Sequence, residues 1–324
     1  MAAVDQSIAL AANTQLENYT IMYPLSVGGF GVVYLAKDCK TNDLVAIKEY
    51  FPSALCKRVE GSNDVTVQTE LDADLFTAGL RCFFEEARLL SNINHPNVVN
   101  VSNFFRANQT VYMIMDYYEG NGLDKYLANM TGLMPEKRLR TLFAYIASGL
   151  REVHLKHMLH LDIKPANIYL PQATAPIILD FGAARQSVQV DGRQLVGMYT
   201  PGYAAPEQYR SDWPQGPWTD VYALAATMYA CMGRGVPYPA DKRLQQDHLV
   251  PAIKRFSGKY SNELLQLIDS CMILDLSKRQ SSMSVVQKAL LTRPAQWGTA
   301  SETIDMDKKE GFFSGVKKLF GGGE

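Results

Sequence analysis

The chain has 324 residues, of which 47% are hydrophobic and 20% are charged, so it can form one large domain or two lobes around a sizeable core. Its formal net charge of −1 argues against nucleic acid as a partner, and no apolar run approaches the ~18 residues of a transmembrane span. The five cysteines are scattered, odd in number and without a CxxC pair. This usage argues against a disulfide framework or a zinc site and for a reducing, cytoplasmic compartment.

The first third of the chain has a strand-like pattern. Residues 1–17 lack a basic n-region, so they predict a flexible N-terminal lead and not a signal peptide. Residues 19–25 and 32–38 predict two strands on either side of a glycine cluster, and residues 44–51 predict a third strand after turn residues. Residues 57–79 are polar and irregular, which indicates an insertion or loop.

One amphipathic helix interrupts this pattern. Apolar residues recur at helical spacing within residues 80–93, and two more strands are expected at 98–105 and 111–118. After Gly120, helical patterns dominate, and we expect helices at 136–156, 219–232, 261–273 and 282–291. A β-rich half followed by a helical half predicts two lobes that join near residues 116–122.

Two features of the β-rich half favour phosphate binding. Glycines between two strands, as in SVGGFGVVY, let backbone N–H groups approach phosphate oxygens, although taken alone such glycines more often form just a hairpin. Lys48 lies among apolar strand residues, where an ammonium group is costly without an anion unless it snorkels from an edge strand. Glu86, on the amphipathic helix, is a candidate partner charge or simply part of a solvated helix face.

The segment HLDIKPANIYL concentrates catalytic side-chain types. Asp162 can accept a proton from a hydroxyl group, and Lys164 can neutralise a phosphoryl group. Asn167, with Asp180 in ILDFG, supplies the oxygen ligands that Mg²⁺ prefers alongside phosphate oxygens. Taken alone, Asp180 would be read as a turn residue.

Five motifs occur in order along the chain: GGFGVVY, VAIK, HLDIKPAN, DFG and AAPE. Together they resemble the protein kinase family, specifically the serine/threonine kinases of bacteria, over residues 18 to 292. The resemblance implies an α+β, bilobal protein-kinase fold. A small lobe, residues 18–117, would hold a five-stranded antiparallel sheet and one main helix; a larger, mostly helical lobe, residues 118–293, and a tail, residues 294–324, would follow.

The resemblance also assigns an ATP site to the small lobe. Lys48 would hold the α- and β-phosphates, with Glu86 orienting it and Glu85 as the alternative partner. Met115 resembles the gatekeeper, and Asp116 to Tyr118 the hinge that binds adenine through the backbone. The lid and the sheet face over the nucleotide would consist of Val27, Gly28, Gly29, Phe30, Gly31, Val33 and Ala46.

In the larger lobe the resemblance implies the catalytic groups. Asp162 would orient and deprotonate the acceptor hydroxyl, and Lys164 would neutralise the γ-phosphoryl group. Asn167 and Asp180 would bind Mg²⁺, with Mn²⁺ as an alternative. Lys164, together with Thr200 in YTPGY, matches the serine/threonine branch.

Two further pairings in that lobe are expected. Glu207 in AAPE would form a buried ion pair with Arg279, the alternative being two surface charges. Asp220 would brace the backbone of the catalytic loop, or would merely be a favourable acid at a helix N-terminus.

Two positions depart from the family pattern. Ser26 stands where the first glycine of the lid usually lies, which predicts reduced nucleotide affinity at most. Leu161 replaces the arginine that usually precedes the catalytic aspartate and binds an activation-loop phosphate. Leucine cannot pair with a phosphate, so we expect activity without phosphorylation at the usual site. Ser187 and Thr200 are candidate phosphorylation sites, and Thr200 is better explained as a structural platform residue.

The predicted function is therefore transfer of the ATP γ-phosphoryl group to serine or threonine of protein substrates, including the chain itself. A cognate phosphatase or upstream regulator is an expected partner. The alternatives are a pseudokinase, a small-molecule kinase of related fold, and a scaffold that acts through its tail. The tail carries an apolar set that is consistent with disorder, partner docking or membrane contact: Phe312, Val316, Leu319 and Phe320.

Overall fold

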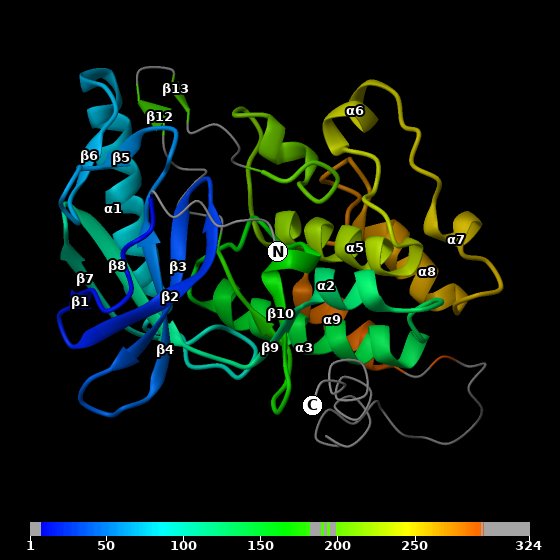
Figure 1. The fold of residues 1–324 in the computed structure, drawn as a ribbon. Helices are drawn as coiled ribbons and strands as arrows, with labels where there is room; N and C mark the ends of the chain where they lie inside the picture. The colour runs from blue at the N-terminus through cyan, green and yellow to red at the C-terminus, as the bar shows by residue number, and fades with distance from the viewer. Residues whose placement is uncertain (1–7, 182–188, 191–192, 195–198, 293, 295–324) are drawn as a thin grey trace. The chain divides into compact units, whose positions relative to one another are not determined.

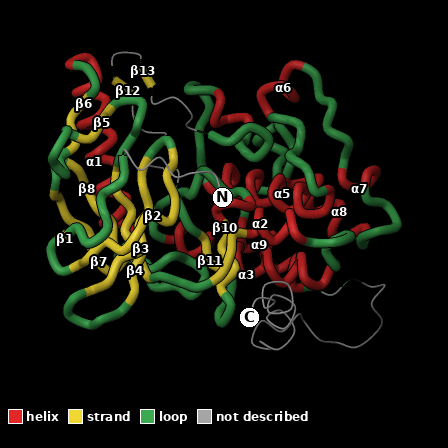
Figure 2. Tube along the Cα trace, in the orientation of Figure 1, coloured by secondary structure: helices red, strands yellow, loops and turns green. Residues whose placement is uncertain are grey.

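The computed structural model describes residues 8–181, 189–190, 193–194, 199–292 and 294. This part of the chain forms two compact units. The first contains residues 8–94 and 99–118 and the short strands after 188, and the second contains residues 95–98, 119–181 and the described residues from 199 onward. Figure 1 shows the strands of the first unit beside α1, and Figure 2 shows that helices predominate in the second.

Among the described residues, the first unit holds a six-stranded antiparallel sheet in the order β1-β2-β3-β4-β8-β7. The sequence predicted five strands, and the additional one is the two-residue β1, which pairs with the start of β2 at the sheet edge. The strands are β1 (Gln15–Leu16), β2 (Tyr19–Gly28), β3 (Gly31–Asp38), β4 (Leu44–Tyr50), β7 (Val101–Ala107) and β8 (Thr110–Asp116).

The lead segment only partly resembles the flexible segment predicted for residues 1–17. Residues 1–7 lie outside the described part, but Leu10 and Leu16 are buried. The backbone N–H of Leu10 donates to the Tyr34 hydroxyl at 3.1 Å. Residues 8–17 therefore belong to the packed small unit, through contacts with β2 and β3.

Helix α1 (Ala73–Leu90) begins seven residues before the predicted start at residue 80. Leu75 and Phe76 are buried together with Phe83 and Leu90, so the apolar face continues through the segment expected to be irregular. Acids before and within the first turn favour this earlier start, because they complement the helix dipole. The buried face of α1 packs on β7 and β8 (Figure 1).

The rest of the expected insertion also has regular structure. Strands β5 (Cys56–Arg58) and β6 (Val65–Val67) form an antiparallel pair, and the 3₁₀ turn η1 (Glu70–Asp72) leads into α1. The Val65 N–H donates to the carbonyl of Asn108 at 2.9 Å, which joins this hairpin to the β7–β8 turn. The prediction of an irregular loop at 57–79 is therefore wrong.

The second unit is built around α5 (Pro217–Gly233), which is buried along almost its whole length from Thr219 to Met232. A helix that is apolar on all sides belongs in the centre of a helical domain, and α3 (Glu136–Leu155), α8 (Asn262–Cys271) and α9 (Met283–Leu291) pack against it. These four helices were predicted within a few residues. Three shorter ones were not: α2 (Leu123–Asn129), α6 (Ala240–Gln245) and α7 (Ala252–Arg255).

Short elements carry the loops of interest. A three-stranded sheet, in the order β11-β10-β9, holds the segment between the catalytic loop and Asp180. The remaining elements are β9 (Gly120–Gly122), η2 (Pro165–Asn167), β10 (Ile168–Pro171), β11 (Ile177–Ile178), β12 (Gln189–Val190), β13 (Arg193–Gln194) and η3 (Pro206–Tyr209). Within the described ranges, none of the helices combines the length and the apolar character that a membrane crossing requires.

Candidate active site

The glycine-rich loop is a tight turn between β2 and β3. Gly28 pairs with Gly31, so Gly29 and Phe30 form the tip. A Cβ on Gly31 would lie 2.3 Å from the carbonyl oxygen of Glu49, whereas a Cβ on Gly29 would meet nothing within 4 Å. Close backbone approach therefore requires glycine at 31, and the protein itself sets no such steric requirement at 29.

Lys48 lies on the central strand β4, between β3 and β8, so snorkelling from an edge strand does not explain it. Its ammonium group lies 5.8 Å from the centre of the Phe83 ring on α1. Glu86 follows Phe83 by three residues, faces the same side of α1 and is buried. Glu85 is exposed and forms an ion pair with Arg88 at 2.8 Å. Of the two candidates, only Glu86 lies on the buried face next to Lys48.

The strand register places several of the predicted adenine-side residues on the face of the sheet that carries Lys48. Val33 pairs with Lys48, while Ala46, two residues before Lys48 on β4, pairs with Met115 on β8. Val27 pairs with Val32 on β3, and Val32 is opposite Glu49 and not Lys48, so the register puts Val27 on the other face of the sheet. Val33, Ala46 and Met115 therefore form the side of the sheet around Lys48, without Val27.

The predicted hinge has its own hydrogen bonds. The backbone N–H of Asp116 donates to the carbonyl of Asn100 at 3.2 Å, and its carboxylate accepts from the Asn100 amide at 3.2 Å. The Tyr118 hydroxyl donates to Asp116 at 3.3 Å. Burial, together with the Asp116 charge, raises the pKa of Tyr118 to about 12. The adenine contact assigned to Asp116–Tyr118 stays a prediction.

In the second unit, the Asp162 carboxylate receives hydrogen bonds on both oxygens. Lys164 Nζ donates to Oδ2 at 2.9 Å and to Oδ1 at 3.1 Å, and the Thr200 hydroxyl donates to Oδ1 at 2.8 Å. Lys164 also donates to the Thr200 hydroxyl at 2.7 Å, and the Asn167 amide donates to Oδ2 at 3.0 Å. These charged and neutral donors fix the orientation of the buried carboxylate. A general base needs such a fixed orientation to accept a proton from a substrate hydroxyl.

The same loop positions two oxygen groups suitable for a metal ion. The Asn167 side-chain NH₂ group is committed to Asp162, so its amide oxygen points away from that carboxylate. The NH₂ group also lies 3.4 Å from the backbone carbonyl of Asp180, which brings these two residues together. Asp180 is half-buried and has a positive φ of 52°. No cluster of three His, Cys, Asp or Glu side chains suited to a metal occurs in the described ranges. One amide and one carboxylate fit Mg²⁺, which binds few protein ligands when phosphate oxygens complete its shell.

The backbone before Asp162 is held in an unusual conformation. Leu161 has a φ of 64°, which costs a non-glycine residue about 1–2 kcal/mol. Two contacts maintain it, because the Leu161 N–H donates to Asp220 at 2.8 Å and Gln208 donates to the Leu161 carbonyl at 2.9 Å. Asp220 also accepts from the His160 N–H at 2.9 Å and contacts the His154 ring at 2.8 Å. The prediction that Asp220 braces the catalytic loop is confirmed.

Burial alone would raise the pKa of Asp220, but its hydrogen bonds from His154 and the His160 backbone hold that pKa below the ordinary value. Burial lowers the pKa of His160. The His160 ring accepts from the Asp162 N–H on Nδ1 at 3.2 Å and donates from Nε2 to the Leu179 carbonyl at 3.0 Å. A neutral imidazole satisfies both contacts.

The predicted ion pair between Glu207 and Arg279 is also confirmed. Both side chains are fully buried, and the two N···O distances are 2.7 and 3.0 Å. The Thr219 hydroxyl donates to the same carboxylate at 2.8 Å, and the remaining Arg279 donors reach backbone carbonyls, including that of Ile273 at 2.7 Å. The pair therefore fixes the segment around η3 to α5 and to the loop before α9.

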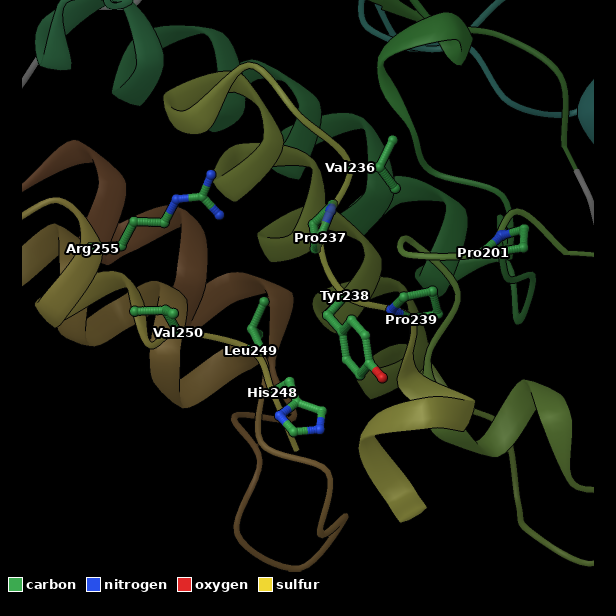
Figure 3. A pocket seen from close by; sticks show the side chains of 9 residues that line it. All are labelled: Pro201, Val236, Pro237, Tyr238, Pro239, His248, Leu249, Val250 and Arg255. Atoms are coloured by element: carbon green, nitrogen blue, oxygen red, sulfur yellow. The ribbon is translucent and has the colours of Figure 1, made fainter. Parts of the chain in front are cut away.

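An open hollow lies beside the platform segment that begins with Thr200 (Figure 3). Its lining residues are Pro201, Val236, Pro237, Tyr238, Pro239, His248, Leu249, Val250 and Arg255. Gly202 has a φ of 89°, and a Cβ there would lie 2.3 Å from a Val236 methyl group. Glycine is thus needed where the platform meets the wall of the hollow.

The structure brings together the predicted residues of each unit separately. The second unit holds a cluster of four predicted residues, Asp162, Lys164, Asn167 and Asp180. In the first unit, Lys48 on β4 lies next to the buried face of α1 that carries Glu86. The convergence of these two groups around one nucleotide stays a prediction. His154 and Gln208 were not predicted from the sequence, and both hold the catalytic loop through partners distant in sequence. Ser187 and the apolar tail set (Phe312, Val316, Leu319 and Phe320) lie outside the described residues.

Comparison with known proteins agrees with this geometry. A family model described as protein kinase domain matches residues 19–291. The chain is 26% identical over 294 residues to the probable serine/threonine-protein kinase MARK-A of Dictyostelium discoideum, covering 90% of this chain and 26% of that protein. It is 28% identical over 292 residues to the serine/threonine-protein kinase pkn2 of Myxococcus xanthus, covering 84% of this chain and 32% of that protein. The chain thus spans about a quarter to a third of the length of these curated relatives.

Two solved structures have the same fold. The apo form of PpkA-294 is 32% identical, with a TM-score of 0.79 over 88% of this chain and 100% of that chain. The kinase domain of PknI from Mycobacterium tuberculosis is 21% identical, with a TM-score of 0.66 over 87% of this chain and 98% of that chain, and this likeness concerns the fold alone. These matches confirm the bilobal kinase fold, with a β-sheet lobe and a mostly helical lobe. From the family match over residues 19–291 and the clustered motif residues, we conclude that this chain belongs to the protein kinase family.

Proposed function

We propose that the chain is a protein serine/threonine kinase that transfers the γ-phosphoryl group of ATP to serine or threonine hydroxyls of proteins. The observation that carries the proposal is the Asp162 carboxylate, buried and held by donors from Lys164, Thr200 and Asn167. A carboxylate oriented in this way suits a hydroxyl that must attack in line with a departing ADP.

In the proposed reaction, the acceptor hydroxyl oxygen forms a bond to the γ-phosphorus. The bond from the γ-phosphorus to the oxygen that bridges the β-phosphorus breaks, and ADP leaves with that oxygen. Asp162 accepts the hydroxyl proton. Lys164, which already donates to Asp162 at 2.9 Å, lies where an ammonium group can neutralise the transferring oxygens. Positioning and charge stabilisation supply most of the rate enhancement in such a loose transition state.

Nucleotide binding is proposed for the small unit. Lys48 would hold the α- and β-phosphates, and Glu86 would orient its ammonium group on the buried face of α1. The turn at Gly29 and Phe30 would cover the phosphates. Magnesium, when bound, neutralises phosphate charge, and the amide oxygen of Asn167 with the carboxylate of Asp180 would hold it.

The platform around Thr200 supports serine or threonine as the acceptor. The Thr200 hydroxyl lies between Lys164 and Asp162, at 2.7 and 2.8 Å, so the catalytic carboxylate is joined directly to this segment. Pro201 then forms one wall of the hollow in Figure 3. An acceptor chain that lies along Pro201 would reach Asp162 with a short side chain, which favours proteins with serine or threonine in an extended segment.

We further propose that activity does not require a phosphate on the activation segment. The side chain at the usual arginine position is Leu161, which is buried and cannot pair with a phosphate. The contacts from Asp220 and Gln208 already fix the Leu161 backbone without any modification. Treatment of the purified chain with a phosphatase, followed by removal of the phosphatase, should leave its initial rate unchanged. Complete loss of activity would refute this part of the proposal.

Protein partners follow from the same proposal. A phosphatase that reverses the modification, or an upstream regulator, would complete the signalling role. All five cysteines lie in described positions and none of them forms a disulfide there, which supports action in a reducing compartment such as the cytoplasm.

Phosphotransfer from labelled ATP tests the proposal. Asp162→Asn should lower transfer to a protein acceptor by at least about 100-fold, because general-base catalysis contributes about 10²–10⁴-fold. Lys48→Met should lower transfer by about 100-fold as well, because the phosphates lose the group that positions them. Lys37→Met is the matched control, since Lys37 is an exposed lysine on the neighbouring strand β3. Phosphoamino-acid analysis should recover phosphoserine or phosphothreonine. Unchanged transfer by Asp162→Asn, or phosphotyrosine as the product, would contradict the proposal. If the chain were a pseudokinase, neither the wild type nor any variant would transfer phosphate.

A further inference from the structure

Glu49, the residue after Lys48, is fully buried on the opposite face of β4. Its carboxylate receives four hydrogen bonds. The Arg58 guanidinium donates to both oxygens at 2.8 Å, the Tyr34 hydroxyl donates to Oε2 at 2.6 Å, and the Tyr112 hydroxyl donates to Oε1 at 2.8 Å. We call Tyr34, Glu49, Arg58 and Tyr112 the Glu49 cluster. None of these residues has a role in the chemistry proposed above.

The Glu49 cluster connects the three central strands of the sheet. Tyr34 lies on β3, Glu49 on β4 and Tyr112 on β8, and β4 lies between the other two. Glu49 and Tyr112 are a directly opposed pair in the β4–β8 ladder. Burial, followed by the Glu49 charge, raises the pKa values of both tyrosines, so their hydroxyls remain protonated donors at neutral pH. The carboxylate thus fixes the position of β4 between its neighbours, one residue away from Lys48.

The same cluster ties peripheral segments to that strand. Arg58 comes from the end of β5, and it also donates to the carbonyl of Ile8 at 2.7 Å and to the carbonyl of Asn63 at 2.8 Å. The Leu10 N–H donates to the Tyr34 hydroxyl at 3.1 Å. Residues 8–10 and the β5–β6 hairpin therefore both contact the sheet through the cluster.

We propose that the Glu49 cluster is a positioning device for Lys48, through which residues 8–10 and the β5–β6 hairpin set the affinity for the nucleotide. The inference rests on the proposed role of Lys48 in holding the α- and β-phosphates. Without Arg58, the buried Glu49 carboxylate loses its only charged partner in the cluster and β4 must shift to reach solvent or other donors. A shift of β4 at Glu49 also moves the adjacent Lys48, whose ammonium group must stay within hydrogen-bond distance of the phosphates to hold them.

Isothermal titration of the full chain with Mg-ADP tests the proposal, since ADP carries the two phosphates assigned to Lys48. Arg58→Met should weaken Mg-ADP binding by about tenfold or more, the affinity equivalent of one lost hydrogen bond between Lys48 and a phosphate. The titration is done at a temperature where thermal unfolding shows the variant to be folded. Arg140→Met is the matched control. Arg140 is also a buried arginine, 2.7 Å from a glutamate (Glu136), but it lies on α3 in the other unit. Arg140→Met should change the Kd for Mg-ADP by less than about twofold, well below the tenfold change expected for Arg58→Met.

Rescue and truncation separate positioning from general stability. Arg58→Lys keeps a cation for Glu49 and should restore most of the affinity lost in Arg58→Met. If Arg58→Met does not fold, deletion of residues 1–10 replaces it. That variant removes the contacts to Ile8 and Leu10 but keeps the Glu49–Arg58 pair, and we expect weaker Mg-ADP binding than in the full chain.

The proposal is overturned if folded Arg58→Met, or the truncated chain when Arg58→Met does not fold, binds Mg-ADP as the full chain does. It is also overturned if Arg140→Met is impaired to the same extent as Arg58→Met. Lys48→Met distinguishes the two levels of the argument. If Lys48→Met binds Mg-ADP normally, the assigned role of Lys48 fails; if only Lys48→Met is impaired, the positioning role of the Glu49 cluster fails.

Discussion

Replacing Thr200 by valine tests how the catalytic carboxylate is held. Valine has nearly the same shape as threonine but removes the hydroxyl that donates to Asp162 at 2.8 Å and accepts from Lys164 at 2.7 Å. Lys164 and Asn167 continue to donate to Asp162, so the carboxylate is loosened but not left unpaired. Thr200→Val should therefore lower kcat while the protein stays folded.

The magnitude follows from the bonds that are lost. A hydrogen bond to a charged group contributes about 1.5–3 kcal/mol. If the hydrogen bond from Thr200 to Asp162 stabilises mainly the transition state, its loss lowers kcat by roughly 10- to 100-fold, since about 1.4 kcal/mol corresponds to a factor of ten. The KM for ATP should change much less than kcat, because the hydroxyl of Thr200 bonds to Lys164 and Asp162, whereas the α- and β-phosphates are assigned to Lys48.

Steady-state phosphotransfer to a protein acceptor, with thermal unfolding in parallel, measures this effect. Thr200→Ser is the matched control because it keeps the hydroxyl, and its kcat should remain within about threefold of that of the wild type, well under 1 kcal/mol in barrier height. A valine variant with normal kcat would refute the reasoning. Equal losses in the serine and valine variants would also refute it, because the hydroxyl would then not be the relevant group.

Three further predictions concern stability and pH. Arg279→Met should lower the free energy of unfolding by about 3–5 kcal/mol in urea titrations, because it leaves the buried Glu207 carboxylate without its charged partner. Arg210→Met, which breaks the exposed pair with Asp212 at 2.9 Å, should have no measurable effect on that free energy. Equal losses in the two variants would contradict the burial argument. Gly31→Ala should cost about 1–3 kcal/mol in thermal unfolding through its contact with the Glu49 carbonyl, and Gly29→Ala should leave stability unchanged; the reverse order would be incompatible with the turn geometry. The pKa of His160 should lie below the ordinary value of 6.5 when its ring resonances are followed by NMR. The contribution of the neutral ring to stability is therefore present above pH 6.5 and is lost as the pH falls below that value. A measured pKa at or above 6.5 would exclude a neutral buried ring.

The parts of the fold that could be predicted are those whose pattern is local. Helix α3 was expected at 136–156 and spans Glu136–Leu155, because its apolar residues recur at helical spacing on one face. The start of α1 was missed although Leu75 and Phe76 carry the same periodicity as Phe83. The polar residues before them favoured a loop, and the contacts of this segment with the sheet are not visible in a local window.

The candidate site shows the same division. Asp162, Asn167 and Asp180 were predictable because the catalytic loop and the DFG segment place them at short, fixed spacings. The residues that hold this loop come from far along the chain: His154 is 66 residues from Asp220, and Gln208 is 47 residues from Leu161. Tertiary packing alone determines such pairs, so neither composition nor periodicity indicates them.

The most direct measurement is a crystal structure of the chain with Mg²⁺ and a non-hydrolysable ATP analogue. We expect the Asn167 amide oxygen and the Asp180 carboxylate to coordinate Mg²⁺ at about 2.1 Å. We also expect Lys48 Nζ to donate to the α- and β-phosphates, with the γ-phosphate directed toward Asp162. A triphosphate bound elsewhere, or a Lys48 ammonium group that remains remote from the phosphates, would contradict the account.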